Sequence, residues 1–134
     1  MDKQLPTSGQ LERNLSQNIQ RLYRQELAHS PSKITCKLFG SQLAIVIEDA
    51  LTSVEKTLAK SDLDNSTTVR QLNRAINNAI KSRLKNLIEE ILDVNVLDIL
   101  FDSTFETSRT GAIATLETTP LVRNSQSIPK NKRR

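Results

Sequence analysis

The 134-residue sequence has few of the residues that build disulfides, metal sites and cofactor pockets. It has no tryptophan, one tyrosine, three phenylalanines, one histidine and one cysteine. A single cysteine excludes an internal disulfide and agrees with a reducing compartment. The three glycines are isolated from one another, so the sequence has no glycine-rich phosphate-binding loop. The core must therefore be built mainly from leucine, isoleucine and valine.

Long hydrophobic runs are missing as well. The longest uncharged stretch, Leu38 to Ile47, is far shorter than the about 20 apolar residues that a membrane-spanning helix needs. The N-terminal stretch does not combine a charged start with an apolar run, which a secretory signal requires. We therefore expect a cytoplasmic protein, and any role at a membrane would be that of a peripheral partner.

The basic charge of the chain is concentrated at one end. The formal net charge is +4, but residues 118–134 hold five lysines and arginines and no acid. Outside this segment 14 basic residues remain against 15 acidic ones. The high isoelectric point therefore describes the C-terminal segment and says little about the rest of the surface.

Helical periodicity marks the N-terminal part of the chain. Residues 1–8 are expected to be flexible, and apolar residues then recur at helical spacing, which predicts an amphipathic helix over about 9–28. Thr7 and Gln10 have the spacing of a capping box at its start. Pro31 ends it, because the residue before a proline is pushed out of the α region.

Two strands and a short helix follow. Apolar and polar residues alternate over 34–38, and 43–47 is almost continuously apolar, so the two segments predict a hairpin that turns at Gly40. Thr52 and Glu55 then form a second capping-box signature, which opens a short helix that reaches about residue 60.

The second half of the chain predicts one long helix and two more strands. Apolar residues from about 68 to 92 recur at an average close to 3.6 residues, which predicts a long helix. Segments 94–101 and 112–116 predict two more strands. Beyond Pro120 the periodicity is lost, and we expect 118–134 to be a disordered basic tail.

These elements predict one α+β domain over 9–117, in the order α-β-β-α-α-β-β. Two main helices and a short one would cover one face of a four-stranded antiparallel sheet, forming a two-layer sandwich. Leu97, Ile99 and Phe101 share one face of the third strand, and Val94, Val96 and Leu100 share the other. A strand that is apolar on both faces favours a homodimer.

No residue pattern supports catalysis or metal binding. His29 has no neighbouring carboxylate, cysteine or second imidazole, so a surface or cap role is favoured. Cys36 lies on the apolar side of its strand, where a thiol usually packs in the core. We therefore expect no enzyme activity, no metal and no cofactor.

Two groups of cations could bind nucleic acid. Arg70, Arg74, Lys81 and Lys85 lie within about 60° of one another on a helical wheel, together with Asn77. Such a stripe could contact phosphates, although a solvated helix face is the commoner reason for one. The tail offers a second group of possible contacts, which are Lys130, Lys132, Arg133 and Arg134.

Arg83 falls within the apolar stripe of the long helix, near Leu72 and Ile76. A guanidinium in that position is costly unless a carboxylate pairs with it. Glu55 on the preceding short helix is the nearest candidate along the chain, so we predict a structural ion pair between Glu55 and Arg83. The alternative is that Glu55 only caps its helix and that Arg83 extends to the edge of the core.

Two blocks resemble a known bacterial family. They are the segment Leu51-Thr52-Ser53-Val54-Glu55-Lys56-Thr57-Leu58-Ala59 and the segment Arg83-Leu84-Lys85-Asn86-Leu87-Ile88-Glu89-Glu90, followed by a strand that leads to Asp102. The chain is similar over about 10–117 to a domain-of-unknown-function family labelled MpsC, of a Na⁺-translocating membrane-potential-generating system. The family's leucine–threonine pair, glutamate and arginine match Leu51, Thr52, Glu55 and Arg83.

The chain also departs from this family's pattern. A Gly-Arg-Gly-Pro-like loop is common before the first strand in the family, and here Ala28-His29-Ser30-Pro31 keeps only the proline. A histidine often precedes the aspartate, and here Leu100 stands in its place. If relatives bind a ligand at these positions, this chain has lost or changed that binding.

The resemblance implies a protein linked to membrane ion or inorganic-carbon transport, without an established enzyme activity. Together with the residues, it predicts a non-enzymatic interaction or regulatory module, homodimeric and working with an unidentified protein partner. The alternative is a nucleic-acid-binding protein that uses the basic tail and the Arg70/Arg74/Lys81/Lys85 stripe.

Overall fold

The structure, a computed structural model, describes residues 4–60 and 65–123 and has the predicted α+β fold. A four-stranded antiparallel sheet has the order β1-β2-β4-β3. The elements are α1 (Ser8–Leu27), β1 (Lys33–Phe39), β2 (Gln42–Glu48), α2 (Ser53–Lys60), α3 (Asn65–Leu92), β3 (Val96–Thr104) and β4 (Arg109–Leu116).

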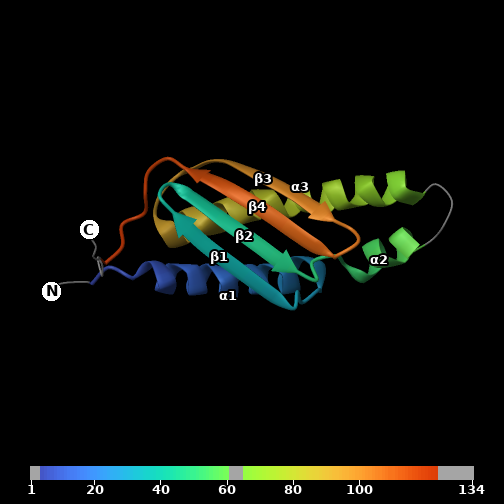
Figure 1. Cartoon of the computed structure of the whole chain (residues 1–134), viewed down its shortest axis with the longest axis horizontal. Coiled ribbons are helices and arrows are strands. Elements are labelled where there is room, and N and C mark those ends of the chain that lie inside the picture. The colour runs from blue at the N-terminus through green and yellow to red at the C-terminus, as the bar shows by residue number, and fades with distance from the viewer. Residues whose placement is uncertain (1–3, 61–64, 124–134) are drawn as a thin grey trace, which may run out of the picture.

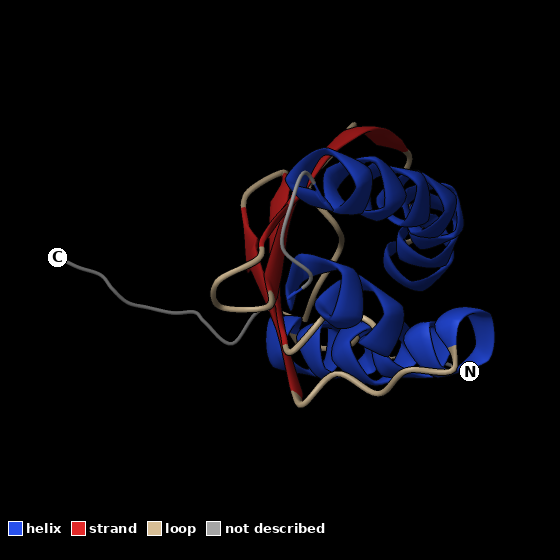
Figure 2. Ribbon diagram, turned by 90° about the vertical axis from the view of Figure 1, so that its right-hand side faces the viewer, coloured by secondary structure: helices blue, strands red, loops and turns tan. Residues whose placement is uncertain are grey.

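The helices lie on one side of the sheet. Figure 1 looks onto the sheet with α1 and α3 behind it, and Figure 2 shows the two layers from the side. Helix α1 packs against β1, α3 packs against β3, and α2 contacts α3. The expected two-layer sandwich is thus confirmed, and no helix of the described residues 4–60 and 65–123 lies on the opposite face of the sheet.

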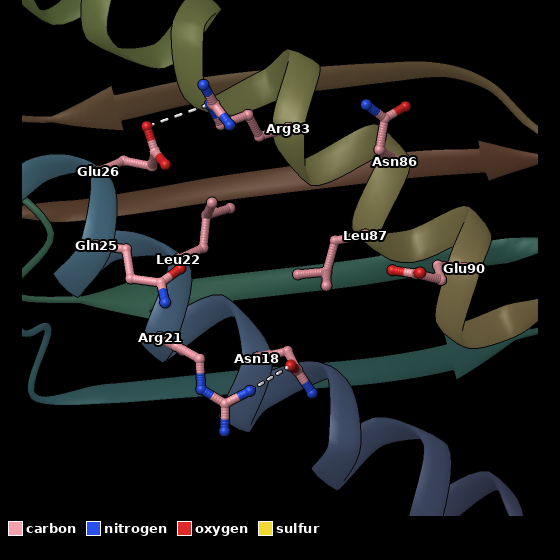
Figure 3. Close-up of a pocket in the computed structure, with 9 residues that line it drawn as sticks. All are labelled: Asn18, Arg21, Leu22, Gln25, Glu26, Arg83, Asn86, Leu87 and Glu90. Atoms are coloured by element: carbon pink, nitrogen blue, oxygen red, sulfur yellow. Dashed lines mark hydrogen bonds and ion pairs between the residues drawn. The ribbon is translucent and has the colours of Figure 1, made fainter.

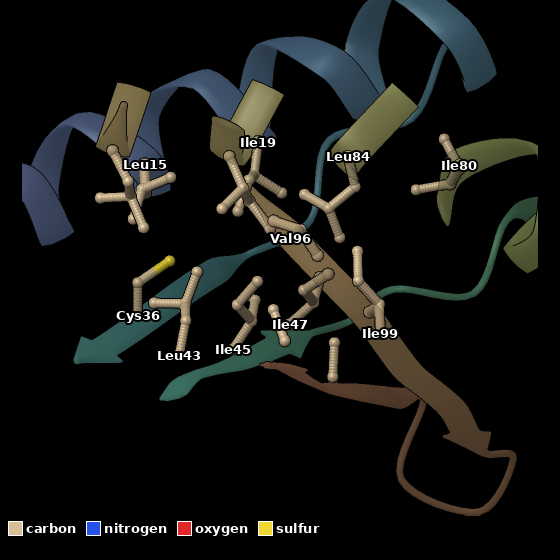
Figure 4. Packing of buried hydrophobic residues seen from close by; sticks show 14 of the residues in the cluster. Leu15, Ile19, Cys36, Leu43, Ile45, Ile47, Ile80, Leu84, Val96 and Ile99 are labelled. Atoms are coloured by element: carbon tan, nitrogen blue, oxygen red, sulfur yellow. The ribbon is translucent and has the colours of Figure 1, made fainter. Parts of the chain in front are cut away.

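The core fills the space between the two layers (Figure 4). Leu15 and Ile19 of α1 and Leu84 of α3 meet the inward side chains of the strands, such as Ile45 and Ile47, and all five are almost fully buried. Successive residues of a strand point to opposite faces, so β2 places Leu43, Ile45 and Ile47 inward. Apart from Tyr23, the fully buried hydrophobic side chains of the described residues are aliphatic.

Both predicted capping boxes are present. The Thr7 hydroxyl accepts from the Gln10 N–H at 3.1 Å, and the Gln10 side chain accepts from the Thr7 N–H at 2.9 Å. Thr52 and Glu55 make the same exchange, at 3.3 Å and 2.9 Å. These reciprocal bonds satisfy helix N-terminal donors that have no partner within the helix.

The strand β3 differs from the prediction. Val96 and Ile99 were expected on opposite faces, but both are buried, because the register shifts between Val96 and Asp98. An irregularity of this kind adds a residue to one strand and reverses the alternation beyond it. Leu97 and Leu100 are exposed, but Asp98 and Asp102 are exposed too, so the outward side of the strand is only partly apolar.

The two ends of the described domain lie side by side (Figure 1). In the first part of the segment that we expect to be a disordered tail, Pro120 is buried and Val122 packs against the core. The Arg123 N–H donates to the Pro6 carbonyl at 2.7 Å, which ties this segment to the N-terminal residues. The rest of the predicted tail, 124–134, lies outside the described residues, as do residues 1–3.

Candidate functional site

The face of the sheet opposite α1 and α3 is the first candidate site. Outward side chains lie in rows across the four strands, and the register defines two central rows. One row runs Thr35, Val46, Gly111, Asp102, and the next runs Lys37, Ala44, Ile113, Leu100. We call this surface the outer sheet face.

Large apolar side chains are exposed on the outer sheet face. Leu100 is 70% exposed and Phe39 is 53% exposed, while Val46 and Ile113 are each 36% exposed. An apolar patch that spans several strands is typical of an interaction site, whereas single exposed apolar residues need no explanation. The fold therefore presents a surface that it has not used for its own core.

Charge divides the outer sheet face from one edge to the other. Lys33 and Lys37 point outward on β1, and Asp98 and Asp102 do so on β3. Between them, the Arg109 Nε lies 2.9 Å from the Glu48 carboxylate across β2 and β4. The Lys37 ammonium also lies 3.9 Å from Glu12 of α1, but its side chain is still largely exposed. One edge is basic and the opposite edge is acidic.

A hollow of about 560 Å³ lies over Gly111 on this face. Val46, Asp102, Thr104 and Arg109 are among the residues that line it. A Cβ atom added at Gly111 would meet only the Ile45 carbonyl oxygen, at 3.9 Å, which is an ordinary contact. The fold of one chain thus leaves room for a side chain at this position.

The second candidate is a buried polar network around Glu55, which is 1% exposed. Its carboxylate accepts from the Thr52 backbone and hydroxyl at 2.9 and 3.0 Å, and from the Asn73 amide at 2.6 Å. The Asn77 amide donates to Asn73 at 3.1 Å and to the Ser103 hydroxyl at 3.2 Å. The network joins α2, α3 and β3. Sequence reasoning missed Asn73 and placed Asn77 on the basic stripe, but Asn77 is buried.

The predicted pair of Glu55 and Arg83 is wrong. The Arg83 Nε lies 3.2 Å from the Glu26 carboxylate, and the Arg83 side chain is 60% exposed. The buried side of α3 follows Val69, Asn73 and Asn77 before it reaches Ile80 and Leu84, whereas Leu72 and Ile76 are only half buried. Arg83 is therefore on the flank of α3 that faces α1.

Glu26 and Arg83 border a groove of about 260 Å³ between α1 and α3 (Figure 3). Leu22 and Leu87 form its apolar floor, and Arg21 lies at its other end. The Arg21 guanidinium donates to the Asn18 side chain at 3.0 Å. The arginine at each end of the groove thus contacts a side chain of the same domain.

The residues of the predicted basic stripe differ in their surroundings. Arg70 lies over the ring of Phe105, 5.3 Å from its centroid, and with Arg74 it borders a hollow of about 90 Å³ above Asn73 and Asn77. Lys81 is half buried, while Lys85 is exposed. The predicted tail contacts Lys130, Lys132, Arg133 and Arg134 lie outside the described residues.

Cys36 and His29 have structural surroundings. Burial raises the pKa of the Cys36 thiol to about 11, which keeps it neutral and poorly nucleophilic at ordinary pH. The His29 ring lies 2.7 Å from the Asp49 carbonyl, in the junction between helix and strand. Burial also raises the pKa of Tyr23, with the Glu55 charge acting in the same direction.

The described residues contain no group of three or more histidine, cysteine or acidic side chains placed to hold a metal ion. Within the same residues, no helix has both the length and the apolar character to cross a membrane.

Comparison with known proteins shows the family. The family model described as Na⁺-translocating membrane potential-generating system (MpsC) matches residues 7–118. The chain belongs to the MpsC family. Neither a curated protein nor a solved structure matches it. The matched range contains both the outer sheet face and the Glu55 network, which are thus parts of the family domain.

Proposed function

We propose that this MpsC-family chain is a non-enzymatic interaction module that works as a cytoplasmic, peripheral partner of a membrane ion or inorganic-carbon transport system. The family description supplies the link to a membrane Na⁺ system. The observation that carries the proposal is the outer sheet face, where Phe39, Leu100 and Ile113 remain exposed on a domain that already has a complete core.

Protein–protein contact fits this surface better than small-molecule binding. Ligand pockets are concave and bury most of their ligand. The outer sheet face is broad, and its charged groups lie along its two edges and, as the Arg109–Glu48 pair, at one end of the central strands. An apolar centre with charged residues around it is the usual composition of a protein interface. We therefore propose that the module acts through contacts with other folded proteins.

Affinity capture from native membranes tests this proposal. Tagged chain would be incubated with solubilised membranes of its own host, and bound proteins would be identified by mass spectrometry. We expect enrichment of ion-transport subunits over a tagged unrelated domain of the same charge. The absence of any transport subunit after capture and after chemical cross-linking would reject the proposal.

The nucleic-acid alternative has one supporting observation, the exposure of Arg70, Arg74 and Lys85 along α3. Binding through phosphates would weaken steeply with salt, by a factor that reports the number of phosphates neutralised. Titration of RNA and DNA with the full chain and with a chain lacking 124–134 tests it. Failure of the full chain to bind at physiological salt rejects this alternative.

A further inference from the structure

The two central strands of the outer sheet face carry large and small residues in an alternating arrangement. In one row Val46 of β2 lies beside Gly111 of β4, and in the next row Ala44 of β2 lies beside Ile113 of β4. From the first row to the second, β2 changes from a large residue to a small one, whereas β4 changes from a small residue to a large one. A surface of this kind can fit a rotated copy of itself.

We propose that a second copy of this chain docks on the outer sheet face, related to the first by a twofold axis that runs parallel to the strands between β2 and β4. This inference rests on the proposed interaction function and names one partner for it. Interfaces of twofold dimers are self-complementary, because the same patch is used on both subunits. The rotation places β2 opposite β4, and β1 opposite β3.

Shape agrees with this arrangement. Val46 of one copy would enter the hollow over Gly111 of the other, and Ile113 would lie against the small side chain of Ala44. Two sheets that pack face to face are about 10 Å apart, with interdigitated side chains, and their strands cross at about 30°. The two central rows lie near the middle of the strands, where the strands of the two sheets would cross, so this crossing disturbs their pairing least.

Charge agrees as well. Asp102 of one copy would lie opposite Thr35 of the other, with Lys33 and Lys37 on either side of it along β1. The basic edge of each chain thus meets the acidic edge of its partner. A twofold axis perpendicular to the strands would instead place β1 over β1 and β3 over β3, and such contacts between like charges are unfavourable.

The size of the outer sheet face indicates how strongly two copies should associate. The stretch of about seven residues over which the four strands are paired covers a flat area of roughly 20 by 24 Å. Stable interfaces bury about 800 Å² of accessible surface on each partner, so this face is at the small end of the range. We therefore expect a reversible dimer whose population rises with concentration.

Charge reversal at each edge tests the inference. One variant carries Lys33→Glu and Lys37→Glu, and a second carries Asp98→Lys and Asp102→Lys. Sedimentation equilibrium of the full chain would measure the dimer Kd, and circular dichroism would confirm folding. A control with Lys81→Glu and Lys85→Glu on α3 makes the same change in net charge as the first variant, away from the outer sheet face.

We expect each edge variant alone to dimerise at least about ten-fold more weakly than the wild type, because like charges now face each other. An equimolar mixture of the two variants should form a heterodimer of near wild-type affinity, since every opposed pair is again of opposite sign. The α3 control should keep the wild-type Kd.

Three results would overturn the inference. They are a wild-type chain that stays monomeric up to about millimolar concentration, edge variants that dimerise as well as the α3 control, and a chain that dimerises only after removal of 124–134. Membrane capture separates this inference from the proposed function. A monomer that still recovers transport subunits rejects the dimer alone, and a dimer that recovers none rejects the membrane role alone.

Discussion

The two faces of the sheet are made from the same strands but have different roles. On β2, Ile45 is 1% exposed against the helices, while the next residue, Val46, is 36% exposed on the outer sheet face. The inner side chains are enclosed by α1 and α3, whereas no helix of the described residues covers the outer ones. We conclude that the inner face determines folding stability and that the outer face is available for association.

The largest difference is expected between substitutions at neighbouring positions of β2. Ile45→Ala removes buried methyl groups and leaves a cavity, so it should lower the free energy of unfolding by about 2–5 kcal/mol. Val46→Ala, measured as a monomer, should cost less than about 1 kcal/mol. Denaturant unfolding at low micromolar concentration measures both, and equal losses would contradict the division between the faces.

The buried polar network should behave like part of the inner face. Asn73→Ala removes the amide that donates to Glu55 and leaves buried polar groups without a partner, which should cost about 1–3 kcal/mol. In a double-mutant cycle, Glu55→Gln should be coupled to Asn73→Ala and additive with Arg83→Met. Coupling to Arg83 instead would restore the pairing that the sequence suggested.

Cys36 makes the inner face sensitive to alkaline pH. Its thiol pKa is raised by burial from 9.0 to about 11 in the folded chain, so its contribution to stability is complete below pH 9 and is lost as the pH rises toward 11. We expect a loss of about 1 kcal/mol between pH 8 and 10. Tyr23 contributes in the same direction above its ordinary pKa of 10.0.

The comparison with Cys36→Ala isolates this effect. The variant should start from lower stability, because it loses a buried group, but its stability should fall less steeply between pH 8 and 10. Unfolding curves at several pH values provide the measurement. If stability falls equally with pH in the two proteins, the pKa of the Cys36 thiol is the same in the folded and the unfolded chain, which would contradict this prediction.

The smallest effect is expected at the groove between the two main helices. Arg83→Met breaks an ion pair with Glu26 whose two side chains are 60% and 33% exposed, so the loss should not exceed about 1 kcal/mol. The loss should shrink further at high salt. A large loss that salt does not change would place Arg83 in the core after all.

Periodicity predicted most of the fold, because helices and strands bury one side each. The order of elements, both capping boxes and the buried position of Cys36 follow from spacing along the chain. The irregularity near Leu97 was not predictable in this way, since one residue out of register reverses the faces of β3 without changing its composition.

The candidate sites were harder to predict. Asn73 and Asn77 follow the buried phase of α3 in steps of four residues from Val69, and polar residues in that phase were the available signal. Their partners Glu55 and Ser103 come from distant segments, so the network depends on tertiary packing. The outer sheet face likewise depends on which strands become neighbours, which local pattern does not show.

The most direct test of the division between the two faces is the variant Gly111→Val. A Cβ atom at this position would make only an ordinary van der Waals contact. Valine also favours a strand more than glycine does, so the stability of the monomer should be unchanged or higher. The new side chain should fill the hollow that receives Val46 of the second copy. Sedimentation equilibrium and unfolding of the same sample should therefore show weaker dimerisation with undiminished stability. A dimer of unchanged Kd in a stably folded variant would contradict the account.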